Sequence, residues 1–492
     1  MTLATGLIAH LERPLARGHV PAGAHTGAAG GAACGDLIRV SLALHPGSPD
    51  GRILDAGFDA SGCGATIAAG SVVVDLLLRG TPLLEAALIG ADTIAQELGG
   101  LTPAKRHAAE LAADALHRAL GFALRQADLA PAPERTLVAM SGGVDSAVAA
   151  LLVAGSGEET AAVTLELWSD PAGDGEASCC SAQAVRSARS LAHEIGVPHF
   201  SIDLRAEFRA GVVDPWLSDH ATGLTPNPCV RCNGSVRLDA MLDLATRLGA
   251  CTLATGHYAR IDRDELALGP LLQTAVDPAK DQSYALSGLS RDSLRRLRFP
   301  LGELTKPEVR ALAQRAGLPV ARRRDSQDLC FLAGTRRTEF LARHGRLGAH
   351  PGPIVDRDGR LLGEHSGVHT VTVGQRRGLG SGPGLHRAGE PLYVLATDPV
   401  SNTVTVGARD ELLTRTVRVR DATLHRDGER IDTVKVRYRG ARLDCRLAAP
   451  AAAGEHRAIE VELLQPAERT APGQIACLYD GEHRIVGHGT IA

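Results

Sequence analysis

The sequence predicts a multidomain α/β protein with a small α+β domain, a doubly wound parallel sheet, a small central domain and a C-terminal antiparallel β-barrel. A chain of 492 residues is long enough for about three or four domains. Strands and helices alternate after the first quarter, which predicts a parallel sheet with helices on both faces. Short alternating strands follow beyond about Asp356, which predicts the barrel. The expected domains are 1–125, 136–332, 333–409 and 410–492, with a linker at 126–135.

The first domain opens with a Gly/Ala loop, GAHTGAAGGAACGD, ahead of two strand-like stretches, DLIRVSLAL and GRILDAGFDASGCG. Two segments of helical length and period follow, ATIAAGSVVVDLLL and TPAKRHAAELAADALHRALGFAL. Strands followed by helices predict an α+β domain. The Pro/Ala-rich RQADLAPAPERT that comes next is typical of a linker.

Four apolar runs are expected to form the parallel sheet, namely TLVAM, TAAVTLEL, PHFSIDL and CTLATG. Helical segments such as AQAVRSARSLAHEIG separate them. The expected barrel region contains NTVTVGA, TVRVRDATL, TVKVRYRG and HRAIEVELL, which alternate between apolar and polar residues as half-buried strands do.

The composition, 44% apolar and 22% charged, is that of a soluble globular chain. No apolar run is long enough to span a bilayer and no signal-peptide pattern opens the chain, so we expect a cytoplasmic protein with no membrane partner. In a cytoplasmic protein, ten cysteines indicate catalysis or metal binding rather than disulfide bonds. The net charge is −3, but residues 291–346 carry 14 Lys and Arg against 6 Asp and Glu. Such a stretch forms either solvated helix faces or a surface for a phosphate backbone.

The segment LVAMSGGVDSAVAALLVAG combines a strand, a glycine turn at Ser141-Gly142-Gly143 and a helix that begins near Asp145. Backbone N–H groups at such a turn form an anion cradle that glycines let phosphate approach. The loop lacks the lysine of a Walker motif and the spacing of a dinucleotide-binding motif. It resembles the PP-loop of ATP pyrophosphatases, which implies ATP cleavage to AMP and pyrophosphate.

The segment TPNPCVRCNG places two cysteines three residues apart at the expected start of a helix. Pro228 suits the first turn, and Cys229 and Cys232 then share one face near the positive end of the helix dipole, which favours thiolate. The pair is half a zinc site, a redox pair or a nucleophile. The spacing of Cys179 and Cys180 disfavours zinc, which needs a second ligand pair. Cys330, in RRRDSQDLCFL, is either a core residue or another reactive thiol.

Eight motifs occur in the order expected of one family: AMSGGVDS, SCCS, TPNPCVRCN, LATGHYAR, KDQSY, DSQDLCF, GQRRGLG and APGQIACLYDGE. From about residue 135 to 492 the chain therefore resembles the tRNA-specific 2-thiouridylases (MnmA). The resemblance implies ATP contacts at Ala139, Met140, Ser141, Gly142, Gly143, Val144, Asp145, Ser146, Leu165 and Gly256. It implies base and tRNA contacts at Asn227, Pro228, Cys229, Lys280, Asp281, Gln282, Arg437 and Tyr438.

The same resemblance implies the chemistry. ATP adenylates O2 of the wobble uridine, sulfur held as a persulfide on Cys330 attacks C2, and Cys232 releases the product by forming a disulfide with Cys330. Mg²⁺ is expected to bridge the ATP phosphates, with Asp145 as a contact. The implied partners are tRNAs for Lys, Glu and Gln and a cysteine desulfurase or persulfide carrier. This interpretation assigns the basic stretch at 291–346 to an RNA surface.

Cys229 adds a second route for sulfur, because many relatives have Asp at this position. Cys229, Cys232 and Cys330 together offer three thiolates, enough to hold an iron–sulfur cluster with one open iron that carries hydrosulfide. Cluster-dependent and persulfide-dependent thiolation therefore both stay open at this point.

The first domain resembles the NifU/IscU-like iron–sulfur scaffolds over residues 10–125, through ACGD, GCG and KRHAAELAADAL. Cys34, Asp36, Cys63 and His107 match that family's cluster or zinc ligands. The cysteine expected after His107 is Ala108 in this chain. The domain is expected either to feed sulfur or a cluster to the C-terminal enzyme or to serve as a docking module for a desulfurase.

Two other functions remain as alternatives to a tRNA uridine 2-sulfurtransferase. One is a PP-loop enzyme that delivers ammonia, which the thiol pair disfavours. The other is an iron–sulfur scaffold or carrier protein whose PP-loop senses ATP.

Overall fold

The computed structural model describes residues 3–30, 35–170, 181–263, 268–323, 329–332, 334–385, 391–481 and 483–492. The chain divides into two compact units. The first contains residues 1–205, 240–257 and 296–331, and the second contains 206–239, 258–295 and 332–492. Each unit is described by itself below. None of the helices in the described ranges is long and apolar enough to cross a membrane.

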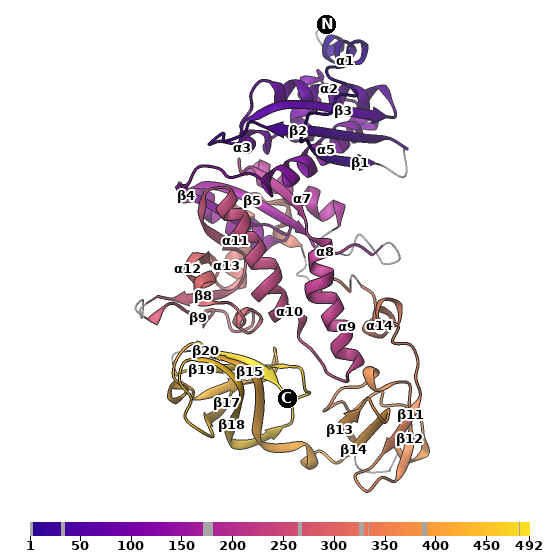
Figure 1. Cartoon of the computed structure of the whole chain (residues 1–492), viewed down its shortest axis with the longest axis vertical. Coiled ribbons are helices and arrows are strands. Elements are labelled where there is room, and N and C mark those ends of the chain that lie inside the picture. Colours follow the sequence, from indigo (N-terminus) through magenta and orange to yellow (C-terminus); the bar gives the residue numbers. More distant parts are fainter. Residues whose placement is uncertain are drawn as a thin grey trace. The chain divides into compact units, whose positions relative to one another are not determined.

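The N-terminal domain is an antiparallel three-stranded sheet in the order β1-β2-β3 with helices packed against it (Figure 1). The strands are β1 (His25–Gly30), β2 (Leu37–Leu44) and β3 (Ile53–Ser61). The helices are α1 (Leu3–Glu12), α2 (Gly64–Leu78), α3 (Leu83–Ala86), α4 (Ala91–Glu97) and α5 (Arg106–Leu124). The predicted α+β domain is confirmed. Helix α5 lies within the second segment predicted as helical, and α2 matches the first but begins one residue earlier, at Gly64.

Helix α5 is buried along most of its length because it lies between two strands. On one side, a Cβ added to Gly27 of β1 would lie 2.2 Å from the carbonyl oxygen of Ala115. On the other side, a Cβ added to Gly121 would lie 2.1 Å from the carbonyl oxygen of Ser201 in the next domain. Glycine at both positions lets helix and strand backbones touch, which any side chain would prevent.

The second domain of the first unit contains a parallel sheet in the order β10-β7-β4-β5-β6. Its strands are β4 (Ala132–Ala139), β5 (Glu159–Glu166), β6 (His199–Asp203), β7 (Ala250–Thr255) and β10 (Leu297–Arg298). The chain builds outward from β4 in one direction and then in the other, so the order reverses beside β4. Ligands bind at the carboxyl ends of the strands at such a point. The predicted doubly wound sheet is confirmed.

Helices α6 (Val144–Gly155), α7 (Ala182–Glu194), α11 (Leu238–Arg247) and α13 (Lys306–Arg315) accompany the sheet. Helix α7 begins with Ser181, whose side chain accepts a hydrogen bond from the backbone N–H of Ala184. Helix α13 begins with a capping box in which Thr305 and Glu308 exchange hydrogen bonds. Both helix starts therefore follow from local sequence.

Three histidines meet where the N-terminal domain contacts the sheet. The ring centroid of His117 on α5 lies 5.6 Å from that of His193 and 6.2 Å from that of His199. His117 reaches the carbonyl oxygens of Ile89 and His199, at 3.0 and 2.9 Å, and a neutral ring donates to only one of them. Burial, with the nearby positive charge of Arg189, holds the pKa of His117 and of His199 well below 6.5.

The second unit contains two β-structures. A four-stranded sheet has the order β12-β11-β14-β13, with β11 (Gly352–Val355), β12 (Leu361–His365), β13 (Tyr393–Asp398) and β14 (Thr403–Gly407). A barrel closes through pairing of β15 with β20 in the order β15-β18-β17-β16-β19-β20. Its strands are β15 (Leu413–Leu424), β16 (Thr433–Lys435), β17 (Leu443–Leu447), β18 (Gly454–Glu468), β19 (Ile475–Tyr479) and β20 (Arg484–Ile491).

The hairpin of β8 (Ala259–Asp262) and β9 (Leu271–Thr274) extends the barrel sheet through β20. Apolar residues inside the barrel, such as Val434, Val461 and Leu478, form its core. The predicted barrel is confirmed, but the strand expected over TVKVRYRG is shorter. It ends at Lys435 because a turn follows, closed by the Gly440 N–H and the Arg437 carbonyl oxygen at 3.0 Å.

The buried histidines predict that acid weakens the first unit. Below about pH 6.5 the unfolded histidines gain protons that folded His117 and His199 do not, so the free energy of unfolding falls as pH decreases. The limiting slope is about 1.4 kcal/mol per pH unit for each histidine. Thermal unfolding of the full chain at pH 7, 6 and 5 measures the effect.

His117→Gln should make that pH dependence shallower, whereas His456→Gln, which alters a partly exposed histidine in β18, should not. An identical pH dependence in His117→Gln and the wild-type chain would contradict the assignment.

Candidate active site

The loop that follows β4 forms the predicted phosphate cradle at the carboxyl edge of the sheet. Gly142 has a φ of +72°, which glycine adopts without strain. The Ser146 hydroxyl accepts a hydrogen bond from the Ser141 N–H at 3.1 Å and donates to the Gly143 carbonyl oxygen at 3.2 Å. These bonds tie the loop to the first turn of α6, where backbone N–H groups point away from the helix.

Two neighbours of the loop lie far along the chain. The Lys306 amine, almost fully buried, donates to both carboxylate oxygens of Asp145 at 2.7 and 2.8 Å. A guanidinium nitrogen of Arg323 donates to the Gly142 carbonyl oxygen at 3.0 Å. Both side chains place positive charge beside a cradle for anions.

Gly256 follows β7 and contacts the start of α6. A Cβ added there would lie 2.7 Å from the backbone nitrogen of Ser146, so only glycine lets these backbones approach. Leu165 is buried in β5, next to β4 in the sheet. The first unit thus assembles the predicted residues from Ala139 to Ser146 and Gly256 around the reversal beside β4, with Leu165 on the neighbouring strand.

The thiol pair begins a helical run in the second unit. The Asn227 side chain caps α10 (Pro228–Arg231) by accepting from the Cys229 N–H at 3.1 Å, and Pro228 occupies the first turn as predicted. A π-helical segment, η3 (Cys232–Arg237), joins α10 to α11. The predicted helix is therefore present but widens from Cys232 onward, and such π-segments are frequent at functional sites.

The two cysteines differ in exposure. Cys229 reaches the surface, whereas Cys232 is buried. The protein around Cys229 desolvates its thiol and so raises its pKa, which opposes the thiolate that the helix dipole was expected to favour. Helix α10 spans four residues, too few for a large dipole.

Several of the predicted tRNA-contact residues gather near Cys229. Burial raises the pKa of the half-exposed Tyr438, and the negative charge of Cys229 and Asp281 raises it further. The positive charge of Lys280 lowers the pKa of the same hydroxyl. The Tyr438 ring lies 6.0 Å from the ring of Tyr284, whose hydroxyl donates to the Ile475 carbonyl oxygen. This part of the second unit therefore combines aromatic rings, a cation and a thiol.

Asp281 and Gln282 also hold the local backbone. Asp281 accepts from the N–H groups of Ala275 and Ser283, and Gln282 accepts from the N–H of Tyr258. Arg437 is exposed and donates to the Arg469 carbonyl oxygen at 3.1 Å. Cys330 is half-buried and belongs to the first unit, and residues 324–328 before it lie outside the described part of the chain.

A second cluster lies in the N-terminal domain, where Asp36, Cys63 and His107 each direct one potential ligand atom to a common point. These atoms lie within 4.8 Å of one another. Asp36 is buried, and the Thr66 hydroxyl donates to it at 2.6 Å. That hydrogen bond is the largest cause of the lowered pKa of Asp36, which keeps the carboxylate ionised as a metal ligand must be.

His107 is oriented from its other side, where Nδ1 lies 2.9 Å from the Ala104 carbonyl oxygen. This contact leaves Nε2 directed at Asp36, at 3.3 Å. Cys34, the fourth predicted ligand, lies outside the described residues, as do Cys179 and Cys180. Ala108, which stands where a scaffold cysteine was expected, is fully buried in α5.

Four family models match the chain in succession. The NifU-like N terminal domain matches residues 4–127, and the tRNA methyl transferase HUP domain matches 134–334. The tRNA methyl transferase PRC-barrel domain matches 338–408, and the aminomethyltransferase beta-barrel domain matches 409–491.

A bifunctional protein NifU/MnmA from Rubrobacter xylanophilus is 43% identical over 99% of this chain and 98% of its own length. The chain belongs to the NifU/MnmA family. The tRNA-specific 2-thiouridylases MnmA of Parvibaculum lavamentivorans and Acidithiobacillus ferrooxidans are each 42% identical. Those matches cover 75% and 73% of this chain and 94% and 99% of the relatives. Both resemblances expected from the motifs are confirmed.

In the MnmA part, the HUP-domain match and the glycine loop together imply ATP binding. Sequence reasoning missed Lys306 and Arg323 beside this loop. Lys306 belongs to a capping sequence, TKPE, which predicts a helix start but does not indicate nucleotide binding. No local pattern connects it to Asp145, which lies 161 residues earlier.

Lys306→Ala should weaken the use of ATP by the MnmA part. The substitution removes the ion pair with Asp145 and a positive charge beside the cradle, which we expect to raise the KM for ATP about tenfold. The measurement is ATP-dependent product formation by the full chain over a range of ATP concentrations. Lys105→Ala, which removes an exposed lysine from the N-terminal domain, is the matched control, and an equal effect of both variants would contradict the assignment.

Proposed function

We propose that this tRNA uridine 2-sulfurtransferase activates O2 of the wobble uridine with ATP at the loop of residues 139–146 and completes the reaction with sulfur from Cys330. The observation that carries the proposal is the presence of the phosphate loop and the thiol pair in a chain that a NifU/MnmA protein matches over 99% of its length. Adenylation makes the uridine oxygen leave as AMP, since phosphate esters leave far more readily than oxide.

In this proposal the described residues bind and orient the nucleotide. Backbone N–H groups of the loop and the first turn of α6 would hold phosphate oxygens, with Gly142 and Gly256 permitting close approach. Mg²⁺ would offset the negative charge of the phosphates. Asp145 is the carboxylate at hand for that ion, and Lys306 keeps it in place in the described structure.

The second unit would receive the tRNA. Asn227, Pro228 and Cys229 would contact the target base, with Tyr438 and Lys280 nearby to stack on bases and to attract phosphate. Lys280, Asp281, Gln282, Arg437 and Tyr438 complete the proposed tRNA set. The basic stretch at 291–346 would supply further charge for the RNA backbone, apart from Lys306 and Arg323, which lie beside the phosphate loop in the first unit. The substrates we propose are tRNAs for Lys, Glu and Gln.

Sulfur transfer needs two cysteines. A persulfide on Cys330, loaded by a cysteine desulfurase or persulfide carrier, would attack C2 of the adenylated uridine and expel AMP. The Cys232 thiolate would then attack the Cys330 sulfur. This step forms a Cys232–Cys330 disulfide, breaks the bond to the transferred sulfur and leaves 2-thiouridine. An external thiol must reduce the disulfide before the next cycle.

A cluster held by Cys229, Cys232 and Cys330 remains the alternative source of sulfur. The exposed Cys229 thiol, three residues before Cys232, favours it, because the persulfide route uses Cys229 only as a base contact and not in the transfer of sulfur. Thiolate sulfurs fit iron, and such a cluster would carry hydrosulfide. Iron content after anaerobic purification separates the two routes.

The cluster of Asp36, Cys63 and His107 is proposed to hold zinc or the iron of an iron–sulfur cluster. Carboxylate, thiolate and imidazole ligands suit both, and the ordered second contacts of Asp36 and His107 support a preformed site. The N-terminal domain would supply sulfur or a cluster to the MnmA part, although Ala108 removes one expected thiol.

Cys232→Ser and Cys330→Ser should each abolish formation of 2-thiouridine, because each cysteine carries one half of the transfer. The measurement is mass spectrometry of tRNA nucleosides after incubation of the full chain with ATP and a sulfur donor. Cys251→Ser, which alters an exposed cysteine on β7, should retain activity. Modification that continues with ammonia and without sulfur would show instead the ammonia-delivering reaction.

Cys63→Ser and Asp36→Asn should each lower the zinc or iron bound per full-length chain, since each removes one of three gathered ligands. Elemental analysis of purified protein measures the loss. Asp59→Asn alters an exposed carboxylate on β3 and should leave the metal content unchanged. Equal metal content in all four proteins would exclude this site.

A further inference from the structure

The N-terminal domain covers the edge of the parallel sheet of the HUP domain. β6 is an edge strand, and the outward backbone groups of an edge strand require partners. The His199 N–H donates to the Ala87 carbonyl oxygen at 3.2 Å, and the Asp203 carbonyl oxygen accepts from Arg125 at 3.1 Å. Gly121 of α5 also lies against the Ser201 carbonyl oxygen, so α5 covers this edge of the sheet.

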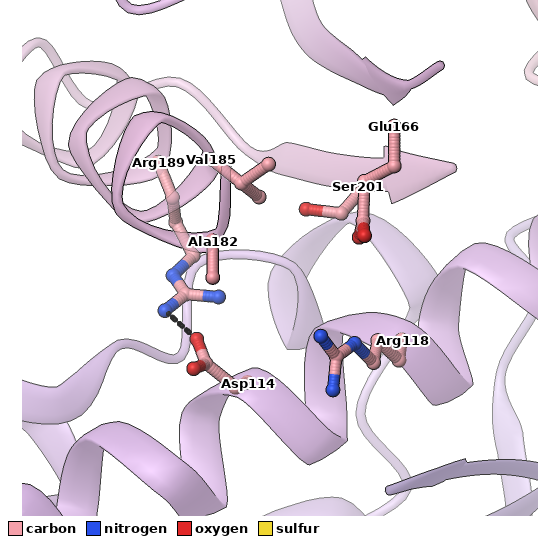
Figure 2. A pocket seen from close by; sticks show the side chains of 7 residues that line it. All are labelled: Asp114, Arg118, Glu166, Ala182, Val185, Arg189 and Ser201. Carbon is pink, nitrogen blue, oxygen red and sulfur yellow. Dashed lines mark hydrogen bonds and ion pairs between the residues drawn. The ribbon is translucent and has the colours of Figure 1, made fainter. Parts of the chain in front are cut away.

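Helix α5 also contacts α7 through one carboxylate. Asp114 of α5 is buried and accepts a hydrogen bond from Arg189 at 2.6 Å (Figure 2). It accepts a second one from Arg186 at 2.7 Å. Arg189 is also buried, so its charge has lost most of its hydration, and Asp114 neutralises it. Removing one partner of such a pair leaves a buried charge without compensation, which costs far more than an exposed pair would.

The other face of α7 contacts the phosphate loop. A Cβ added to Gly142 would lie 3.0 Å from the carbonyl oxygen of Ala184 and 3.6 Å from the backbone nitrogen of Ala188. Ala184 and Ala188 lie four residues apart on one helix face, whereas Arg186 and Arg189 point elsewhere. Helix α7 therefore lies directly between Asp114 of the NifU-like domain and Gly142 of the loop.

A second path joins the same domains. His117 approaches the His199 carbonyl oxygen, and the His199 ring donates from Nε2 to the Thr164 hydroxyl at 2.8 Å. Thr164 in turn donates to the carbonyl oxygen of Met140, at the start of the loop, at 2.9 Å. The loop is thus connected to α5 through β6 and β5 as well as through α7.

The junction around Asp114 is not tightly packed. A pocket there is lined by Asp114, Arg118, Glu166, Ala182, Val185, Arg189 and Ser201, and Figure 2 shows the Ser201 hydroxyl directed into it. That buried hydroxyl has no hydrogen-bond partner among the described residues. The contacts of Asp114 with Arg186 and Arg189 thus join α5 to α7 directly beside this pocket.

We propose that Asp114 of the NifU-like domain is a positioning residue for ATP in the MnmA part. Through Arg186 and Arg189 it holds α7 against Gly142 and so sets the shape of the phosphate cradle. The inference rests on the proposed use of ATP at this loop. It gives the N-terminal domain a role in nucleotide binding that is separate from metal or sulfur handling at Asp36, Cys63 and His107.

The test uses the full-length Asp114→Asn variant, which preserves size and removes charge. Equilibrium binding of a non-hydrolysable ATP analogue at 25 °C is measured, together with the KM for ATP in tRNA thiolation. We expect both to weaken about fivefold to tenfold. The metal content of the N-terminal cluster should not change, because Asp114 lies outside it.

Asp75→Asn is the matched control, since Asp75 forms an exposed ion pair with Arg79 in the same domain. It should bind the analogue as the wild-type chain does. Asp114→Glu retains the charge and should restore affinity to within about twofold of wild type, which a merely structural role would not require. Should Asp114→Asn fail to fold, Arg186→Gln removes only the more exposed contact and should weaken binding about twofold to threefold.

Unchanged affinity in folded Asp114→Asn, or in Arg186→Gln where that variant replaces it, would overturn the inference. A lowered melting temperature with unchanged affinity at 25 °C would do so too, because it would show a role in stability alone. Failure of the wild-type chain to bind the analogue would overturn the proposed ATP site itself, and the inference with it.

Discussion

The contact of helix α5 with strand β6 is the constraint on which the first unit depends. Two backbones touch at Gly121 and Ser201, and no side chain of α5 separates them there. The contact supplies partners for a strand edge that would otherwise expose N–H and carbonyl groups. It also brings Asp114 to α7 and His117 to β6. The N-terminal domain is therefore packed directly against the edge of the sheet.

The chemistry is distributed over the two units. The phosphate loop, Gly256 and Cys330 belong to the first unit, and Cys229, Cys232 and the aromatic residues near them belong to the second. Each unit prepares a different part of the reaction. Glycines and helix N–H groups suit phosphate, whereas rings and cations suit an unstacked base and its backbone.

Local sequence predicted the parts of the site that a few neighbouring residues create. Asn227 and Pro228 are residue types that favour a helix start in this order, and a glycine turn between a strand and a helix forms an anion cradle from its own backbone. The cluster of Asp36, Cys63 and His107 was predicted through resemblance, since its members come from separate elements. The π-segment that begins at Cys232 and the raised pKa of the Cys229 thiol were not predicted, because both depend on packing around the helix.

By itself the sequence determined the class of fold, the phosphate loop and the thiol pair, because strand and helix periodicity, glycine positions and helix caps act over a few residues. Only the tertiary structure decided that Lys306 and Arg323 flank the loop and that Asp114 holds α7 from another domain. Those contacts join residues 72 to 181 positions apart, and burial rather than local spacing determines their strength.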